Sequence, residues 1–256
     1  MSPEDTDRAS LDVVGAGPAY TNRLGATGAS YLVRHARTAI LLDLGQGSFP
    51  RLASLLDPGE LDAVLISHLH PDHFIDLVAL RHYLRWGPNN PRRVRVIGPR
   101  GLGERIDALH AEPGFSAAAL DLEALEPGHL LIGSVDVDIA RVTHADDSFA
   151  FRLAVGGRTG LVYSGDCGRA EDLDVLVRPG DTLLSEVSFG PGPVPPSAAH
   201  LDGPAVGALA ARTRADRVLL THLLMGHDEA RTVESAQRAY NGPVDVVHPG
   251  DTFSFG

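Results

Sequence analysis

The sequence contains no lysine, a single cysteine and no long apolar run. Every basic residue is arginine, to which we assign no functional role. Because Cys167 has no second cysteine to pair with, an internal disulfide is excluded and nothing points to an oxidising compartment. No apolar run reaches the roughly 18–20 residues of a membrane helix, and the chain starts with an acidic segment where a secretory signal would be basic and then apolar. We therefore expect a cytoplasmic protein without a membrane partner.

Positive charge is also scarce. The 33 acidic residues against 22 basic ones give a formal net charge of −11. Such a charge repels a polyanion unless a local patch or a bound metal reverses the field. We therefore expect a small molecule, rather than nucleic acid, to be the favoured partner. The length of 256 residues with 43% hydrophobic residues fits one large globular domain or two tightly fused halves, and we expect a single domain over 1–256.

Short runs rich in valine, isoleucine and leucine alternate with glycine, proline and aspartate, and several are followed by segments of helical period. This pattern predicts an α/β fold with mixed strands flanked by helices. We expect strands at 11–15, 30–34, 39–43, 63–67, 94–97, 135–143, 149–155, 160–164, 182–185, 218–221 and 244–247. We expect helices at 49–56, 72–86, 101–110, 204–212 and 228–240, a glycine hairpin turn at 155–158 and a stiff connector at 190–196.

The segment 67–73 reads Ser-His-Leu-His-Pro-Asp-His and follows an apolar strand. Proline ends the strand pairing, and the strand therefore delivers four potential metal ligands into one loop. The spacing of His68 and His70 allows both imidazoles to reach one ion, whereas Asp72 and His73 are turned toward another. One motif can thus supply ligands to two metals.

Three later polar residues also end apolar runs, namely His144, Asp166 and His222. Loops held at strand ends are the usual location of chemistry in α/β folds. Taken singly, each of these residues could be an ordinary hydrogen-bonded loop residue. Beside the segment 67–73 that alternative weakens, because several imidazoles packed together without metal leave unpaired polar groups.

These positions supply five imidazoles and two carboxylates. Such a donor set suits Zn²⁺, and its carboxylates leave Mn²⁺ or iron open as alternatives. Two ions about 3.5–4 Å apart lower the pKa of a shared water toward about 7 and hold a substrate oxygen for attack. Because zinc supplies no redox chemistry, hydrolysis by a bridging hydroxide is the expected reaction.

With these motifs the sequence resembles the metallo-β-lactamase superfamily over nearly the whole chain, from 11–15 to 250–252. Residues 41–47 look like its first motif, in which the aspartate, here Asp43, has a structural role, and 164–166 and 221–223 look like its later metal motifs. The resemblance implies a four-layer αββα sandwich of two mixed sheets flanked by helices. It also implies two groups of ligands, joined by a bridging Asp166: His68, His70 and His144 for one metal, and Asp72, His73 and His222 for the other.

A metal site with both Asp72 and His73 resembles the sites of the ribonuclease Z and glyoxalase II groups. This resemblance disfavours antibiotic hydrolysis as the activity. Cys167 is interpreted as a packed residue rather than a ligand. The ribonuclease Z branch pairs a glutamate after a core strand with a histidine before the next helix, which here are Glu186 and His200. The resemblance thus assigns catalytic roles to Asp72, His200 and Glu186. His200 would protonate a leaving oxygen or stabilise the charge of the phosphorane, and Glu186 would orient it. The alternative is that His200 caps the following helix and Glu186 is solvated in a loop.

The transfer-RNA-processing enzymes of this branch carry a long arm between the third and fourth metal motifs, but here His144 and Asp166 are too close in sequence for it. This difference, together with the net negative charge, favours a small phosphodiester. The motifs at 161–166 and from 200 to 232 resemble compact bacterial hydrolases related to ribonuclease Z, some of which cleave cyclic nucleotides, and this resemblance makes a 3′,5′-cyclic nucleotide the leading substrate. Alternatives are a ribonuclease Z-type endonuclease, a carboxylic-ester, lactone or thioester hydrolase, and a non-catalytic binding protein. The seven arginines in 81–105 form a basic segment. This segment borders the cleft, where guanidinium groups would suit a phosphate. The alternative is that it forms a solvated face or a subunit contact. The resemblance also implies a homodimer.

Overall fold

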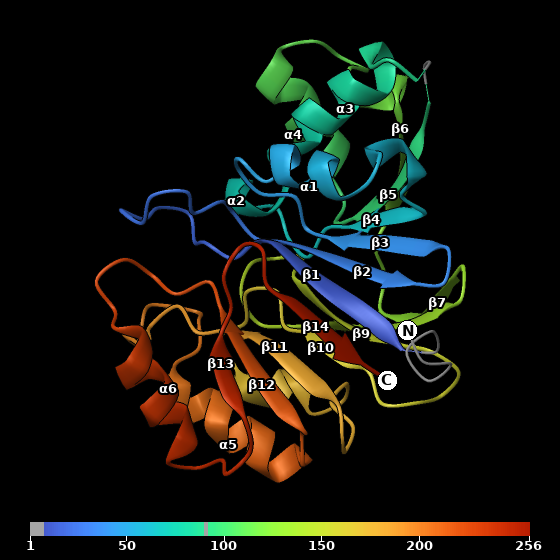
Figure 1. Ribbon diagram of the computed structural model, residues 1–256. Helices are drawn as coiled ribbons and strands as arrows, with labels where there is room; N and C mark the ends of the chain where they lie inside the picture. The colour runs from blue at the N-terminus through green and yellow to red at the C-terminus, as the bar shows by residue number, and fades with distance from the viewer. Residues whose placement is uncertain (1–7, 90–91) are drawn as a thin grey trace.

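The computed structural model describes residues 8–89 and 92–256. Residues 1–7, which belong to the predicted 1–256 domain and to the acidic first segment, lie outside the described residues, as do 90–91. The strands form two sheets of seven strands each, and helices cover the outer face of both (Figure 1). The fold is the predicted four-layer αββα sandwich. No helix in the described ranges combines the length and the apolar character that crossing a membrane requires.

The first sheet is built mainly from the amino-terminal half of the chain. Its order is β14-β1-β2-β3-β4-β5-β6. The β14, β1, β2 and β3 strands pair antiparallel, and β3 to β6 pair parallel. Their bounds are Thr252–Phe255, Ala9–Gly15, Ser30–His35, Thr38–Leu42, Ala63–Leu65, Val94–Gly98 and Leu120–Ala124 in sheet order.

The second sheet has the order β13-β12-β11-β10-β9-β8-β7. The strands from β10 to β13 run parallel, whereas β7 to β10 form an antiparallel meander. Their bounds are Val244–Val246, Arg217–Thr221, Thr182–Glu186, Leu161–Tyr163, Phe149–Ala154, Val135–Arg141 and Gly128–Ile132 in sheet order. The predicted glycine turn joins β9 to β10, with Gly156 and Gly157 at positive φ of 57° and 74°.

The central strands of each sheet are buried on both faces. Along β2, Tyr31 and Val33 point into the core between the sheets, while Leu32 points to the outer core beneath the helices. In the second sheet, Leu184 faces the inter-sheet core and Leu183 faces the outer core. Burial on both faces explains why the central strands read as continuous apolar runs rather than as alternating ones.

Helices α1 (Phe49–Leu55), α3 (Leu77–Trp86) and α4 (Leu102–His110) lie over the first sheet, and α5 (Gly203–Thr213) and α6 (Glu229–Gln237) lie over the second (Figure 1). The short helix α2 (Pro71–Phe74) carries part of the polar motif. Three 3₁₀ turns, η2, η3 and η4, span Pro58–Glu60, Ser116–Ala118 and Ala170–Leu173.

The helix predicted at 72–86 is wrong as a single element, because the chain breaks between α2 and α3. The Asp72 carbonyl accepts from the Ala29 N–H, and the Asp76 N–H donates to the Leu44 carbonyl. These bonds to the adjacent loop replace the helical bond between residues 72 and 76. The predicted helix at 228–240 likewise ends earlier, at Gln237. The strands β6, β7 and β14 were not predicted from the sequence.

Candidate metal centre

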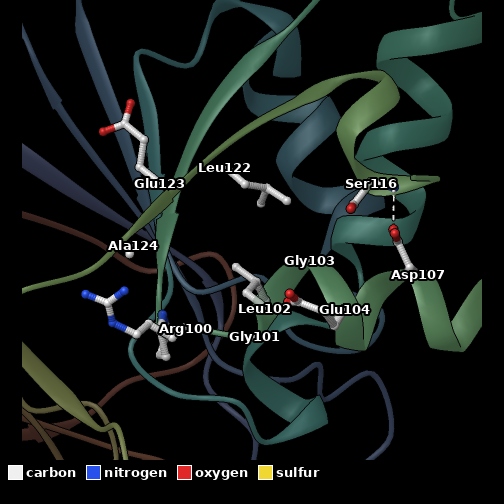
Figure 2. Close-up of a pocket in the computed structure, with 11 residues that line it drawn as sticks. Arg100, Gly101, Leu102, Gly103, Glu104, Asp107, Ser116, Leu122, Glu123 and Ala124 are labelled. Atoms are coloured by element: carbon white, nitrogen blue, oxygen red, sulfur yellow. Dashed lines mark hydrogen bonds between the residues drawn. The ribbon is translucent and has the colours of Figure 1, made fainter. Parts of the chain in front are cut away.

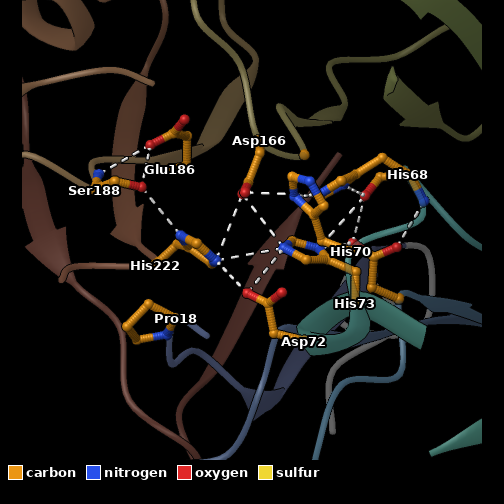
Figure 3. Close-up of polar contacts among 12 residues, drawn as sticks. Pro18, His68, His70, Asp72, His73, Asp166, Glu186, Ser188 and His222 are labelled. Atoms are coloured by element: carbon orange, nitrogen blue, oxygen red, sulfur yellow. Dashed lines mark hydrogen bonds and ion pairs between the residues drawn. The ribbon is translucent and has the colours of Figure 1, made fainter. Parts of the chain in front are cut away.

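Polar residues at the ends of strands from both sheets converge at one edge of the sandwich (Figure 3). The loop after β4 carries His68 and His70, and α2, which follows this loop directly, carries Asp72 and His73. From the second sheet, His144 follows β8, Asp166 follows β10 and His222 follows β12. The structure therefore brings together all seven residues that the sequence singled out as ligands.

One group of donor atoms consists of His68, His70, His144 and Asp166, and their ligand atoms all lie within 4.8 Å of one another. The Nδ1 atom of His70 is 3.0 Å from Nε2 of His68 and 3.0 Å from Nε2 of His144. Oδ2 of Asp166 is 3.7 Å from the His68 nitrogen and 3.5 Å from the His144 nitrogen. His70 is the exposed member of this group, whereas His68 and Asp166 are buried.

The second group consists of Asp72, His73 and His222, and all three residues are buried. Nε2 of His222 is 3.1 Å from Oδ2 of Asp72 and 3.4 Å from Nε2 of His73. Asp166 also reaches this group, because its Oδ1 is 3.4 Å from the His73 nitrogen and 3.6 Å from the His222 nitrogen. The two oxygens of one carboxylate thus face the two groups.

This arrangement fits a pair of divalent ions. Tetrahedral nitrogen and oxygen ligands about 2.0–2.1 Å from zinc are about 3.3 Å from one another, and the donor contacts quoted above span 3.0 to 3.7 Å. Oδ1 of Asp166 is buried and has no hydrogen-bond partner in the described part of the chain. A buried carboxylate oxygen without a partner is costly, and a cation between the groups would satisfy it.

Burial and neighbouring charges shift the pKa values of His68 and His73 in opposite directions. Burial, reinforced by the nearby His73, lowers the pKa of His68 well below its ordinary value. Burial also opposes the charged form of His73, but the carboxylates of Asp166 and Asp43 outweigh it and raise the pKa of His73 well above its ordinary value. Because only deprotonated nitrogens ligate metal, ion binding would displace a proton from His73.

The rings are oriented by hydrogen bonds on their other nitrogen. His73 Nδ1 donates to Asp43 Oδ2 at 2.7 Å, and His144 Nδ1 donates to the Ala199 carbonyl at 2.7 Å. Each of these bonds directs Nε2 toward the donor groups and fixes the tautomer, as is usual for metal-binding histidines. The carbonyl of Ala199 was not predicted from the sequence.

Two serines orient further rings in the same way. Ser67 Oγ donates to Asp43 at 2.7 Å and accepts from His68 Nδ1 at 3.1 Å. Ser188 Oγ donates to Glu186 at 2.6 Å and accepts from His222 Nδ1 at 3.1 Å. Neither serine was predicted as a site residue, although Ser67 directly precedes His68 in the motif.

Asp43 organises the first sheet's part of the centre. Besides the bonds from His73 and the Ser67 hydroxyl, its carboxylate accepts from the Ser67 N–H at 2.6 Å and from the Tyr163 hydroxyl at 2.6 Å. Asp43 is fully buried and has a left-handed backbone with φ of 56°; His222 has a φ of 59°. Left-handed non-glycine residues cluster at functional sites, where the surrounding bonds hold them.

A glycine of the first motif permits this close packing. A Cβ atom on Gly45 would lie 1.9 Å from the carbonyl oxygen of Asp72, so no other residue fits there. The same loop also binds the backbone of α2, because the Leu44 N–H donates to the His73 carbonyl at 2.7 Å. The motif at 41–47 therefore positions the helix that carries Asp72 and His73.

Glu186 and His200 lie beside the donor groups. His200 Nδ1 donates to Glu186 Oε1 at 2.9 Å and lies 4.0 Å from Oδ2 of Asp166. Glu186 is buried, and its carboxylate also accepts the N–H groups of Cys167 and Ser188. Burial lowers the pKa of His200, but the hydrogen bond to Glu186 outweighs it and raises the pKa above its ordinary value. The structure thus places the predicted pair in contact, and His200 does not cap α5, because Asp202 does.

Cys167 is a packed core residue, as the sequence predicted. Its side chain is fully buried in the outer core of the second sheet, and burial raises the pKa of its thiol to about 12. Its sulfur contacts the Arg169 carbonyl at 3.2 Å rather than a donor group.

A cleft of about 640 Å³ opens onto the centre. This volume lies within the 300–1,000 Å³ typical of small-molecule sites. Five of the seven donor residues and His200 supply its polar lining, and its apolar lining includes Tyr20, Phe189 and Leu224.

A separate pocket beside the start of α4 is shown in Figure 2. None of the donor residues lines it; its lining includes Arg100, Leu102, Glu104, Ser116 and Glu123. It lies at the β6 edge of the first sheet.

The basic segment 81–105 borders the centre only in part. Arg100 and Arg105 line a pocket of about 310 Å³ that also reaches His70. Arg81 is instead buried, with its guanidinium 3.9 Å from the Phe115 ring centre. Three further arginines form ion pairs at the surface: Arg92 with Asp57, Arg93 with Asp121 and Arg95 with Glu123.

An αββα sandwich with two adjoining groups of histidine and aspartate donors defines a metal-dependent hydrolase of the metallo-β-lactamase fold. Residues 39–223 match the family described as the beta-lactamase superfamily domain. This chain belongs to that superfamily, as the sequence motifs predicted, and is a metallo-hydrolase.

Two curated relatives match most of the chain. The uncharacterized protein ML1173 of Mycobacterium leprae is 31% identical over 230 residues, which are 87% of this chain and 81% of the relative. The probable metallo-hydrolase YhfI of Bacillus subtilis is 25% identical over 225 residues, which are 86% of this chain and 89% of YhfI.

Solved structures share the fold. The crystal structure of YhfI superposes with a TM-score of 0.86 at 21% identity, covering 97% of this chain and 100% of that chain. The short form of human tRNase Z gives 0.71 at 18% identity, with coverages of 95% and 98%. Yeast PDE1 gives 0.71 at 14% identity, with coverages of 96% and 99%.

Proposed function

We propose that this protein is a dinuclear metal-dependent phosphodiesterase that hydrolyses a small phosphodiester, with a 3′,5′-cyclic nucleotide as the preferred substrate. The observation that carries the proposal is the His200–Glu186 pair, which lies beside two donor groups that share Asp166. The proposed ligands are the seven donor residues described above, and Zn²⁺ is the proposed metal. When bound, two such ions supply Lewis acidity that polarises a phosphoryl oxygen and makes water acidic.

The protein's own residues then have distinct tasks. Asp166 holds the two groups at a fixed separation, and Asp72 completes the second group while facing the cleft. His200 lines the cleft and donates a hydrogen bond from Nδ1 to Glu186, so Nε2 is the nitrogen available for the substrate. A protonated His200 can stabilise the charge that develops on the phosphoryl group and pass a proton to the leaving oxygen. Its raised pKa favours that protonated form.

The size of the cleft and its surroundings support a small substrate. Its volume of about 640 Å³ suits a nucleotide-sized molecule. Between β8 and Asp166 the chain forms only the β9–β10 hairpin, which leaves no arm to grip a folded RNA. The net charge of −11 also disfavours a large polyanion.

A ribonuclease Z-type endonuclease is the second candidate. It is favoured by the likeness to ribonuclease Z 2 of Schizosaccharomyces pombe, which is 26% identical over 203 residues, or 73% of this chain and 29% of that protein. The missing arm argues against this candidate. A carboxylic-ester or lactone hydrolase would need no proton donor at His200.

The test is a substrate panel with metal-loaded protein. Cyclic AMP, bis-para-nitrophenyl phosphate, a lactone series and a structured precursor transfer RNA are compared for wild type and His200→Ala. We expect hydrolysis of the phosphodiesters only, and a loss in kcat/KM of about 10²- to 10⁴-fold in His200→Ala with unchanged metal content. His129→Ala is the matched control, because His129 is an exposed histidine on β7.

Other profiles would overturn the proposal. Preferred turnover of lactones with an active His200→Ala variant would assign the site to ester hydrolysis. Cleavage of the precursor RNA at one 3′ position, without turnover of cyclic AMP, would assign it to the ribonuclease Z type. Full activity of an Asp166→Ala variant would contradict the dinuclear centre itself.

A further inference from the structure

The loop between β1 and β2, residues 16–29, projects from the first sheet at the level of the site (Figure 1). Its base is closed by the hydrogen bond from Gly17 N–H to the Thr27 carbonyl at 2.7 Å. The Pro18 carbonyl accepts from the Gln46 side chain at 3.2 Å. The loop is therefore held against the motif that positions α2.

A second attachment fixes the far side of the loop. The Arg23 guanidinium donates to the carbonyls of Leu223 and His227 at 3.2 and 3.3 Å, and it lies 3.7 Å from Glu229. These acceptors lie in and just after the loop that follows His222. The segment between Pro18 and Arg23 is thus tied at both ends to elements that border the cleft.

Tyr20 lies between these two attachments. Its side chain is 61% exposed and lines the cleft together with His70, Asp72 and His200. Within residues 8–89 and 92–256, Tyr20 forms no hydrogen bond and no ring contact. An exposed aromatic ring on an anchored loop, with a free face at the mouth of a cleft, has the properties of a rigid binding platform, because little entropy is lost when a ligand covers it.

We propose that Tyr20 stacks on the nucleobase of the substrate, so that the site selects nucleotides over aliphatic phosphodiesters. This inference rests on the proposed function, since the phosphoryl group must lie at the donor residues for the base to reach Tyr20. Phe189 and Leu224 extend the apolar wall on the same cleft. Every base has an aromatic face, so stacking selects the presence of a base rather than its identity.

The first test measures binding without turnover. Metal-loaded protein is titrated in a calorimeter with adenosine 5′-monophosphate and with ribose 5-phosphate, two ligands that differ only in the base. We expect wild type to bind the nucleotide about 5- to 50-fold more tightly than the sugar phosphate, and Tyr20→Ala to lose that difference. Tyr20→Phe keeps the ring and is expected to retain it.

Leu24→Ala is the matched control. Leu24 lies on the same loop and is fully exposed, but it does not line the cleft, so its removal is expected to leave both affinities unchanged. Equal binding of the two ligands by wild type, or a Tyr20→Ala variant that retains the preference, would overturn the proposal. A loss of preference in Leu24→Ala as well would show that loop conformation, not stacking, is responsible.

The second test uses turnover and separates the two proposals. With cyclic AMP, Tyr20→Ala is expected to raise KM about 5- to 50-fold with kcat nearly unchanged, whereas the KM for glycerophosphocholine stays the same. A wild-type protein that hydrolyses glycerophosphocholine but not cyclic AMP would refute base stacking while leaving phosphodiester hydrolysis intact. A wild type that hydrolyses neither refutes the proposed function, and the calorimetric comparison then decides on Tyr20 alone.

Discussion

Tyr163 is the residue that joins the second sheet to Asp43. Its hydroxyl donates to Asp43 Oδ2 at 2.6 Å, the same oxygen that accepts from His73. Burial, reinforced by the Asp43 charge, raises the pKa of Tyr163 well above its ordinary value, so the phenol remains a donor. Without this bond Asp43 Oδ2 keeps only the donors Ser67 and His73, and the orientation of the His73 ring is less well fixed.

Tyr163→Phe is therefore expected to weaken metal binding about 10- to 100-fold, measured by competition with a chromophoric chelator. Tyr240→Phe is the control, because it also removes a buried hydroxyl, which here donates to the Ala215 carbonyl at 2.9 Å and lies outside the site. Both variants are expected to lose about 1 kcal/mol of stability. Equal metal affinity in Tyr163→Phe and Tyr240→Phe would show that the hydrogen bond from Tyr163 to Asp43 does not contribute to metal binding.

The donor residues could be predicted from the sequence because each follows an apolar strand and four of them share the segment 67–73. Their supporting atoms could not. Tyr163 reaches Asp43 only through the packing of one sheet on the other. Ser188 and the Ala199 carbonyl reach His222 and His144 through the arrangement of strands and loops within the second sheet. No local spacing encodes such contacts, because they depend on how the strands are ordered. Tyr20 likewise carries no motif around it.

At the scale of elements, Asp57 joins η2 to the end of α3. Its carboxylate caps η2 through the Gly59 N–H at 3.0 Å and accepts from Tyr83 at 3.0 Å and from Arg92. The hydrogen bond from Arg92 is the main reason that the pKa of Asp57 lies well below its ordinary value. A carboxyl whose pKa is lowered on folding stabilises the protein above its unfolded pKa, and the effect disappears as the pH falls through the folded pKa.

Asp57→Asn is accordingly expected to cost about 1–2 kcal/mol at pH 7, measured by urea unfolding. The difference between wild type and variant should shrink as the pH falls below about 4, the usual aspartate value. A difference that stays constant from pH 7 to pH 3 would mean that packing, not charge, accounts for the loss. Glu60→Gln in the same turn serves as the control, since Glu60 accepts none of these bonds.

The central strands of both sheets could be predicted because burial on two faces makes them continuous apolar runs. The strands that were not predicted, β6, β7 and β14, all lie at sheet edges. Edge strands pair on one side only and are half solvated: β6 exposes Asp121 and Glu123, and β7 exposes Leu131. Their mixed composition carries little strand signal. The break between α2 and α3 could not be predicted either, because it depends on backbone hydrogen bonds to the loop after β3.

At the scale of the whole molecule, the donor residues come from both sheets. His68, His70, Asp72 and His73 follow β4 of the first sheet, and His144, Asp166 and His222 follow strands of the second. An ion that binds only the folded arrangement stabilises it by about 2.7 kcal/mol at 100 times its dissociation constant. Removal of metal with a chelator is therefore expected to lower Tm by about 5–10 °C.

That shift should be reversed by zinc in wild type and should be absent in Asp166→Ala. Calorimetry at matched ionic strength measures both. A wild-type Tm that stays unchanged while the chelator removes bound metal would show that metal binding does not stabilise the folded protein.

The order of strands along the chain separates the molecule at the segment between β6 and β7, because nearly all of the first sheet precedes it and all of the second follows. The first donor group draws two residues from either side of that boundary, and the second draws Asp72 and His73 from before it and His222 from after it. A gene divided there would encode two polypeptides that each hold part of both donor groups, and β14 of the later piece would still complete the earlier piece's sheet. Reassembly of such fragments would be governed by the supply of divalent ion, which would make the split protein a metal-dependent switch.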